Sequence, residues 1–174
     1  PFYQLFEDKL SVKNIPTGKQ PLLNSEMNKI WLYGGYPEPN LEEGNNNFWQ
    51  HWMENYYLNY LNRDIAALFP RMNKLKYQRF IKMLANLSST IINRTQLARA
   101  LEVSEGTARE YLSITEGTFL WRELLSYENS TIKSIVKMPK GHIRDSGLLH
   151  YLLKIDTLDD LYVHPIVGYS FESY

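Results

Sequence analysis

The strongest pattern in the chain is a run of large apolar side chains at helical spacing, from residue 48 onward. These side chains are Phe48, Trp52, Tyr56 and Tyr60, with Trp49 and Met53 beside them. A repeat of about four residues places one apolar face along a helix. It predicts a long amphipathic helix that runs to about Leu68 and is ended by Pro70. Before it, prolines and glycines interrupt residues 11–28 and 37–47, which favours loops or short helices there.

A second amphipathic helix is predicted just after Pro70, from about residue 75 to residue 87. Its apolar residues fall at the i, i+3, i+4, i+7 and i+8 positions of one buried stripe. The stripe consists of Tyr77, Phe80, Ile81, Leu84 and Ala85. Three basic side chains, Lys76, Arg79 and Lys82, are expected on the outer face.

Residues 93–112 have the pattern of two short helices around a tight turn. Asn93 or Thr95 can cap the first helix, and Ser104 can cap the second. Two helices that pack this closely need small and apolar contacts on both sides of the turn. The sequence supplies them at Leu97, Ala98, Leu101, Val103, Ala108, Tyr111 and Leu112. The segment is therefore predicted to be a helix-turn-helix.

Two strands are predicted beyond Gly117, which ends the second of these helices. Residues 118–127 and 131–138 have strand character, and residues 128–130 form a turn between them. Two strands joined by a turn directly after a helix-turn-helix form the wing of a winged helix. The predicted fold class is therefore mainly α with a small β component, in which a helical region is followed by a winged helix-turn-helix domain.

Composition narrows the classes of protein that fit. The chain has no cysteine, which removes disulfides, thiolate catalysis and Cys-based zinc sites and fits a reducing cytoplasm. No stretch approaches the roughly 18 consecutive apolar residues of a membrane-spanning helix, so we expect a soluble, cytoplasmic chain with no membrane partner. The chain lacks an initiator methionine and stops within the aromatic run of residues 171–174, so both ends are expected to be cut.

Charge is spread unevenly along the chain although the formal total is zero. Residues 63–145 hold 14 basic against 8 acidic residues, a net +6. Residues 1–62 hold 4 against 7 and residues 146–174 hold 1 against 4, a net −3 each. The asymmetry suggests an acidic partner for the middle segment. The alternative is that it reflects only ordinary scatter of charge along the chain.

DNA is the candidate acidic partner of a winged helix. The basic residues placed to contact it are Arg109 in the second helix of the helix-turn-helix and Lys133, Lys137 and Lys140 in the wing. The same helix also carries carboxylates that would repel phosphates, at Glu105, Glu110 and Glu116. The sequence therefore leaves two interpretations open, a nucleic-acid interface and a surface for protein contacts.

The sequence predicts no catalytic, cofactor-binding or metal site. A P-loop would need glycines followed by Lys and Ser or Thr, and only the fragment at residues 17–19 resembles one. The four histidines show no metal-type spacing beyond a weak i, i+8 pair. Arg63 and Asp64 are expected to form either a partly buried pair or a surface pair.

Five motifs follow one another in an order that resembles a family of prokaryotic AAA-type P-loop ATPases whose C-terminal half is a domain of unknown function. The first is PFYQLF at residues 1–6. The second is GGYPE, with Gly34, Gly35, Pro37 and Glu38. The third is Arg63-Asp64-Ile65. The fourth joins KMPK at residues 137–140 to DSGL, with Asp145 and Gly147. The fifth is GYSFE at residues 168–172.

The resemblance implies a division of the chain into three parts. Residues 1–62 would be a helical lid or linker region of an AAA-type ATPase, residues 63–142 the winged-helix domain, and residues 143–174 the start of a truncated C-terminal domain. The ATP- and Mg²⁺-binding core of the parent protein would lie upstream, because the nucleotide-binding motifs are missing here. The partners implied are that core and the downstream domain of the same protein.

The resemblance thus favours a non-catalytic accessory region that couples the ATPase to a C-terminal domain or partner. The alternative is a winged-helix nucleic-acid-binding module. Glu102 stands where many helix-turn-helix motifs have glycine, which weakens this alternative.

Overall fold

The structure, a computed structural model, describes residues 24–41, 45–125 and 139–174. Its first described segment forms two helices, α2 (Asn24–Tyr33) and α3 (Pro37–Leu41). Proline suits the first position of a helix, because the N–H that it lacks would have no helical partner there. Within these residues, no helix is long and apolar enough to cross a membrane.

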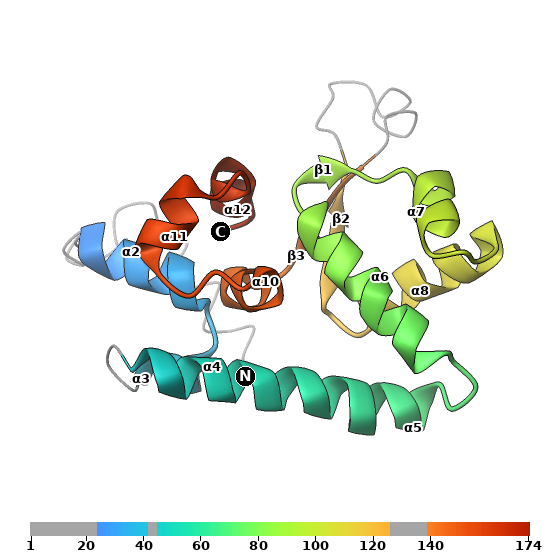
Figure 1. Ribbon diagram of the computed structural model, residues 1–174, viewed down its shortest axis with the longest axis horizontal. Coiled ribbons are helices and arrows are strands. Elements are labelled where there is room, and N and C mark those ends of the chain that lie inside the picture. Colours follow the sequence, from blue (N-terminus) through green and yellow to red (C-terminus); the bar gives the residue numbers. More distant parts are fainter. Residues whose placement is uncertain (1–23, 42–44, 126–138) are drawn as a thin grey trace, which may run out of the picture.

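The long helix predicted after residue 48 is confirmed. It consists of α4 (Asn46–Asn59), the π-helical turn η2 (Tyr60–Ile65) and α5 (Ala66–Leu68), which continue into one another along one side of the molecule (Figure 1). Asn45 caps its start, because its side chain accepts a hydrogen bond from the Phe48 backbone N–H at 3.1 Å.

The buried face of α4 lies one residue beyond the four-residue repeat that predicted the helix. Its buried residues are Trp49, Met53 and Tyr57. Trp52 and Tyr56 of the repeat are only half-buried, because they form a satellite aromatic cluster with Tyr36, which precedes α3. The π-helical turn then carries Tyr60 and Leu61 into the core.

The second predicted helix is confirmed as α6 (Lys74–Asn86), within one residue at each end. All five residues of its predicted stripe are buried. The Asn73 side chain caps it, accepting from the Lys76 N–H at 3.0 Å. Arg79 and Lys82 are exposed as predicted, whereas Lys76 is half-buried.

The helix-turn-helix is formed by α7 (Arg94–Ala100) and α8 (Glu105–Gly117). Its caps are Asn93 and Ser104, whose side chains accept backbone N–H groups at 3.1 Å each. Glu102, in the turn, has φ of +54°, the left-handed conformation that usually favours glycine. The turn therefore keeps its shape with a non-glycine residue in the strained position.

Within the described residues, three short strands complete the winged helix. They are β1 (Thr90–Ile91), β2 (Trp121–Leu124) and β3 (Lys140–Ile143), in the antiparallel order β1-β3-β2. The predicted strand at 118–127 is confirmed in its centre, and the one at 131–138 lies outside the described residues. β1 was missed, because two residues are too few for a pattern. A Cβ on Gly141 would lie 1.8 Å from the Trp121 ring, so glycine alone lets β3 approach β2.

The segment that follows the winged helix packs back onto the segment that precedes it. α10 (Ser146–Leu153) contacts α2, α4, α6 and β3, and α11 (Leu158–Val163) and α12 (Val167–Ser173) lie beside it (Figure 1). A small core forms between these elements, from Trp31, Leu32, Ile155, Leu161 and Ile166. The part of the chain that the structure describes is thus mainly helical with a three-stranded sheet, and the winged helix is held between two packed helical segments.

Candidate functional site

Gly35 and Asp145, from two of the sequence motifs, meet where the chain turns after α2. The Asp145 Oδ2 atom accepts the Gly35 N–H at 2.7 Å, and its Oδ1 atom accepts the Leu148 N–H at 2.7 Å. One carboxylate thereby caps α10 and holds the turn before α3. Gly34 has φ of +85°, a conformation that favours glycine. A Cβ there would also lie 2.4 Å from Asp145 Oδ1, so both the backbone conformation and the lack of space require glycine at this position.

Gly147 brings α10 against the end of α2. A Cβ on Gly147 would lie 2.1 Å from the Tyr33 carbonyl oxygen. Burial raises the pKa of Asp145, although its backbone hydrogen bonds act in the opposite direction. We call Gly34, Gly35, Asp145 and Gly147 the Gly–Asp joint. A side chain has no room at Gly34, where it would meet the Asp145 carboxylate, or at Gly147, where it would meet the backbone of α2.

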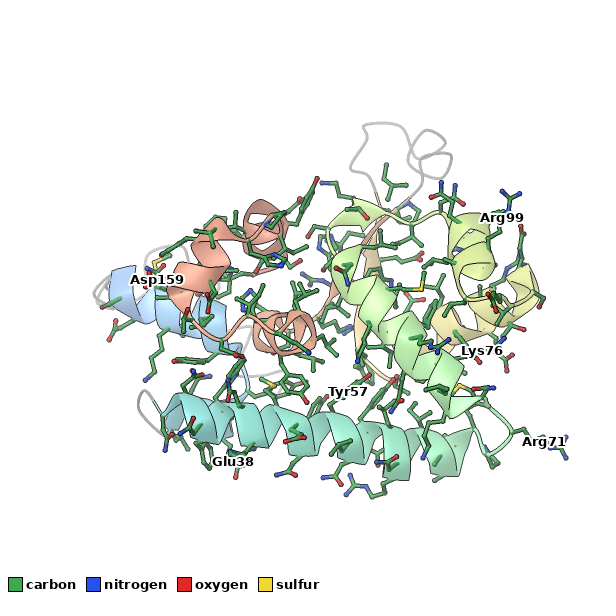
Figure 2. The ribbon with its side chains drawn as sticks, in the orientation of Figure 1. Glu38, Tyr57, Arg71, Lys76, Arg99 and Asp159 are labelled. Atoms are coloured by element: carbon green, nitrogen blue, oxygen red, sulfur yellow. The ribbon has the colours of Figure 1, made fainter. Side chains whose placement is uncertain are left out.

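Pro37 and Glu38 extend this joint toward α4. Pro37 begins α3, and Glu38 accepts a hydrogen bond from Trp52 Nε1 at 2.8 Å. The Tyr36 hydroxyl donates to the Tyr56 hydroxyl at 2.8 Å in the same cluster. Figure 2 shows Glu38 at the end of the long helix that is distant from the winged helix. The structure therefore brings six of the eight motif residues named from the sequence into one region.

Arg63 and Asp64 lie elsewhere, on the π-helical turn η2. They form a surface pair, with 2.8 Å between Arg63 Nε and Asp64 Oδ1 and side chains 74% and 45% exposed. The hydrogen bond from Arg63 lowers the pKa of Asp64. An exposed pair of this kind contributes little stability. The pair lines a hollow of about 360 Å³ beside Trp52, Asn59 and Thr118.

A buried histidine, which the sequence did not single out as a site, connects α2, α10 and α12. His150 Nδ1 donates to the Leu32 carbonyl at 2.8 Å, and the Ser170 hydroxyl donates to His150 Nε2 at 2.6 Å. Trp31 Nε1 in turn donates to Ser170 Oγ at 2.9 Å. Burial lowers the pKa of His150 to about 4, so the ring is neutral. The leucines on both sides of His150 in α10 are the sequence signal of its burial.

A second polar cluster joins α12 to the sheet. The Ser89 hydroxyl donates to the Tyr169 carbonyl at 2.6 Å and lies 3.0 Å from His142 Nδ1. Ser173 Oγ lies 2.7 Å from Ser89 Oγ. Burial, foremost, lowers the pKa of His142. Both clusters are buried and satisfied, so they position α12 and leave no open nucleophile.

The predicted nucleic-acid contacts are only partly within the described residues. Arg109 is exposed on α8. Lys140, on β3, forms an ion pair with Glu172 of α12 at 2.5 Å. Lys133 and Lys137 lie outside the part of the chain that the structure describes. Exposed carboxylates surround Arg109 on α8, at Glu105, Glu110 and Glu116. The exposed face of this helix is therefore acidic.

A groove runs between α8 and the segment that follows the long helix. It consists of two hollows of about 610 and 400 Å³ that share Phe69 and Glu110. We call it the α5–α8 groove. Arg71 and Lys76 both line the larger hollow, and Figure 2 shows the Arg71 side chain pointing outward from the segment after the long helix. The Lys76 ammonium donates to the Glu102 carbonyl at 2.9 Å, so this lysine ties α6 to the helix-turn-helix turn.

The described residues contain no cluster of side chains suited to a metal ion. Nowhere in residues 24–41, 45–125 and 139–174 do three or more His, Asp or Glu side chains gather in a way that could hold a metal ion. The features described there are close approach of backbones, buried hydrogen bonds and a groove whose charged lining residues are Arg71, Lys76 and Glu110. These features suit positioning and recognition.

The sequence matches known proteins. The family described as Domain of unknown function (DUF8612) matches residues 24–159. The chain is 34% identical over 151 residues to Uncharacterized protein Rv2008c of Mycobacterium tuberculosis and, with the same values, to Uncharacterized protein Mb2031c of Mycobacterium bovis. The match covers 87% of this chain and 34% of each relative, so the chain spans about a third of their length. No solved structure matches.

Proposed function

The chain belongs to the family described as Domain of unknown function (DUF8612), and we propose that it is the non-catalytic accessory region of a larger AAA-type ATPase. In this proposal a lid-like helical segment and a winged helix couple the state of the ATPase to a C-terminal domain or partner. The order of the five motifs, which resembles that of AAA-type ATPases, is the reason to propose an ATPase as the larger protein. Its ATP and Mg²⁺ would be bound by the upstream core, because this chain has no P-loop.

The Gly–Asp joint is the observation that carries the proposal. Gly35 and Asp145 are 110 positions apart, with the whole winged helix between them. The joint closes the helical segments before and after the winged helix into one packed unit. If the helices before the winged helix are displaced, the helices after it must move with them, because close-packed interiors transmit displacement. In this proposal the motif glycines have a mechanical role, because they let the two segments approach closely.

Tyr60 supplies the connection from this unit to the winged helix. Its hydroxyl lies 2.8 Å from the hydroxyl of Tyr77 on α6 and 2.8 Å from that of Thr118, at the end of α8. Both partners belong to the winged helix, and Tyr60 stands on the π-helical turn of the long helix. Such turns are frequent at functional positions in helices. Movement of the long helix would therefore reach α6 and α8 together.

The test compares the 174-residue chain with the full-length protein that carries it. We expect no Mg²⁺-dependent phosphate release from the chain alone and measurable release from the full-length protein. ATP binding, followed by calorimetry, should likewise require the upstream core. Hydrolysis of ATP by the purified chain alone would refute the accessory role, and a full-length protein that binds no ATP would refute the ATPase assignment.

Nucleic-acid binding by the winged helix is the second candidate. The net +6 of residues 63–145 favours it, since basic surfaces attract phosphates. The acidic face of α8 and the engagement of Lys140 by Glu172 oppose it. A salt titration of binding to generic duplex DNA decides between them, because phosphate contacts give affinities that fall steeply with salt. Substituting Lys133, Lys137 and Lys140 should weaken any such affinity.

A further inference from the structure

Helix α12 bridges the winged helix and the helical segments that pack around it. On one side it contacts α10, and on the other its Ser173 side chain reaches Ser89, before β1, and His142 on β3. We propose that α12 is an acid-sensitive clamp, which holds the sheet of the winged helix against α2 and α10 while His142 and His150 are neutral and opens when they are protonated. The clamp is independent of the ATPase role proposed above, because all of its contacts lie within the described residues.

The buried face of α12 is polar. Its buried residues are Ser170 and Ser173, which are three positions apart and therefore share one face of the helix. Apolar contacts come from Val167, which is partly buried, and from Phe171, which meets the Trp31 ring but remains 58% exposed. Most helices in proteins are stabilised by the packing of a buried apolar face. The buried contacts of α12 are instead hydrogen bonds, whose strength depends on the protonation of the groups that they join.

Ser170 is the first fixing point of α12, and the direction of its hydrogen bonds follows from its neighbours. An indole N–H can only donate, so Trp31 Nε1 donates to Ser170 Oγ at 2.9 Å. The Leu32 carbonyl can only accept, so His150 Nδ1 donates to it at 2.8 Å, and His150 Nε2 accepts the Ser170 hydroxyl at 2.6 Å. The closed clamp therefore requires a neutral imidazole. A second proton, on Nε2, would aim two donors at the Ser170 oxygen and place a charge in a buried site.

Ser173 is the second fixing point of α12. Its hydroxyl lies 2.7 Å from Ser89 Oγ and 3.2 Å from His142 Nδ1, and the Ser89 hydroxyl donates to the Tyr169 carbonyl at 2.6 Å. Ser89 has φ of +64°, a left-handed conformation that is costly for a residue with a side chain. Such a conformation persists where surrounding contacts enforce it. The contacts of Ser89 with α12 thus connect the helix to a strained position of the winged helix.

His142 lies among charges of both signs. Arg122 and Lys140 face it from the sheet and oppose its protonation, whereas Glu172 of α12 favours it. Glu172 also forms an ion pair with Lys140, so its charge is already engaged. Burial is the largest influence on the pKa of His142 and lowers it. Opening of α12 would therefore bring the ring into water and free Lys140 from its partner.

The titratable group that faces His150 is His164, whose charge opposes protonation of the His150 ring. Burial is again the largest influence and lowers the pKa of His150 to about 4. In the open state the ring would be in water and would take up a proton near pH 6.5. Because the open state binds the proton first, opening becomes easier as the pH falls from about 6.5 toward 4.

Amide hydrogen exchange of the full 174-residue chain, at about pH 7.5 and about pH 5, tests the clamp. Protection factors, which correct for the intrinsic effect of pH on exchange, are compared for α12 and for α6 in the core of the winged helix. The protection of α12 should fall at least about tenfold more than that of α6. The reason is that, at about pH 5, the His150 ring is protonated in the open state and neutral in the closed one.

Two matched pairs of variants connect this opening to the hydrogen bonds of the clamp. At about pH 7.5, Ser170→Ala should raise the exchange of α12 about tenfold, because it removes the partner of both Trp31 and His150. Ser113→Ala, at an exposed position on α8, should leave it unchanged. His150→Gln should flatten the pH dependence of α12 protection, whereas His51→Gln, exposed on α4, should preserve it.

An NMR titration of the wild-type chain needs no variant. The imidazole of His150 should take up its proton in the same pH range in which α12 loses protection, because protonation and opening are coupled.

Three results would overturn the clamp. The first is an equal loss of protection in α12 and α6, which would indicate global unfolding by acid. The second is an α12 whose protection does not change, and the third is a His150 ring that titrates while α12 stays protected. None of these measurements involves ATP, so the accessory role fails separately, if the chain hydrolyses ATP by itself or the full-length protein binds none.

Discussion

The Asp145 carboxylate accepts the Gly35 backbone N–H at 2.7 Å, across 110 positions of sequence. The same carboxylate caps α10 through the Leu148 N–H. Two backbone donors therefore converge on one partly buried acid, and the helical segments on either side of the winged helix depend on it.

Asp145→Asn should destabilise the protein, because an amide offers one acceptor where the carboxylate offers two. Its NH₂ group would face a backbone donor, so at least one of the two backbone N–H groups would lose its partner. We expect the free energy of unfolding to fall by about 1–3 kcal/mol, measured by urea denaturation. Asp159→Asn, at an exposed position on α11, is the control and should cost well under that. Equal losses in the two variants would show that the joint is not stabilised through Asp145.

Gly147→Ala should disrupt the joint through sterics alone. The added methyl group would lie 2.1 Å from the Tyr33 carbonyl oxygen, and this atom belongs to the backbone, which cannot rotate away. We expect a loss of about 1–3 kcal/mol, as for overpacked cores. Gly117→Ala is the control, because nothing lies within 4 Å of the added methyl. A thermal melt in which Gly147→Ala matches the wild type would contradict the close approach.

Acid should weaken the packing of α12 through His150. Burial lowers its pKa to about 4, whereas an unfolded histidine titrates near 6.5. The depressed pKa means that the unfolded state takes up the proton first as the pH falls. The stabilisation is therefore complete above about pH 6.5 and is lost between about pH 6.5 and pH 4, by up to about 3 kcal/mol.

Urea denaturation at a series of pH values measures this loss, and an NMR titration of the imidazole measures the pKa itself. His150→Gln should be less stable at neutral pH and lose less stability toward pH 4. His51→Gln is the control, since His51 is exposed on α4. An imidazole of His150 that titrates near 6.5 would contradict the account.

Glu102→Gly should stabilise the protein. Glu102 adopts φ of +54° in the helix-turn-helix turn, a conformation that costs a side-chain-bearing residue about 1 kcal/mol and glycine very little. We expect a gain of about 0.5–1 kcal/mol in the free energy of unfolding. Glu105→Gly, in the first turn of α8, should instead destabilise by a similar amount. If both glycines destabilised, the turn would have a different conformation.

The sequence predicted most of the local structure. The stripe of α6 and the caps Asn93 and Ser104 follow from spacing and residue type, so they needed no tertiary information. The motif glycines could be named in advance, but the reason for Gly147 could not. That reason is the Tyr33 carbonyl, and it becomes visible only when α2 and α10 are in contact.

The contacts between side chains that are distant in the sequence could not be predicted from the sequence. The hydrogen bond between His150 and Ser170 depends on the folding of α12 onto α10, and two serines on a short helix give no sign that they will be buried. The α5–α8 groove likewise arises where the end of the long helix comes to lie beside α8. No periodicity encodes it, because its walls come from separate elements.

The most direct test of the central claim is amide hydrogen exchange of the full-length protein, with and without a non-hydrolysable ATP analogue. Coupling through the long helix predicts that the analogue changes exchange in α6 and α8, and that Tyr60→Phe, which removes the hydroxyl shared with Tyr77 and Thr118, reduces this change. Exchange in the winged helix that stays the same while the upstream core responds to the analogue would contradict the account.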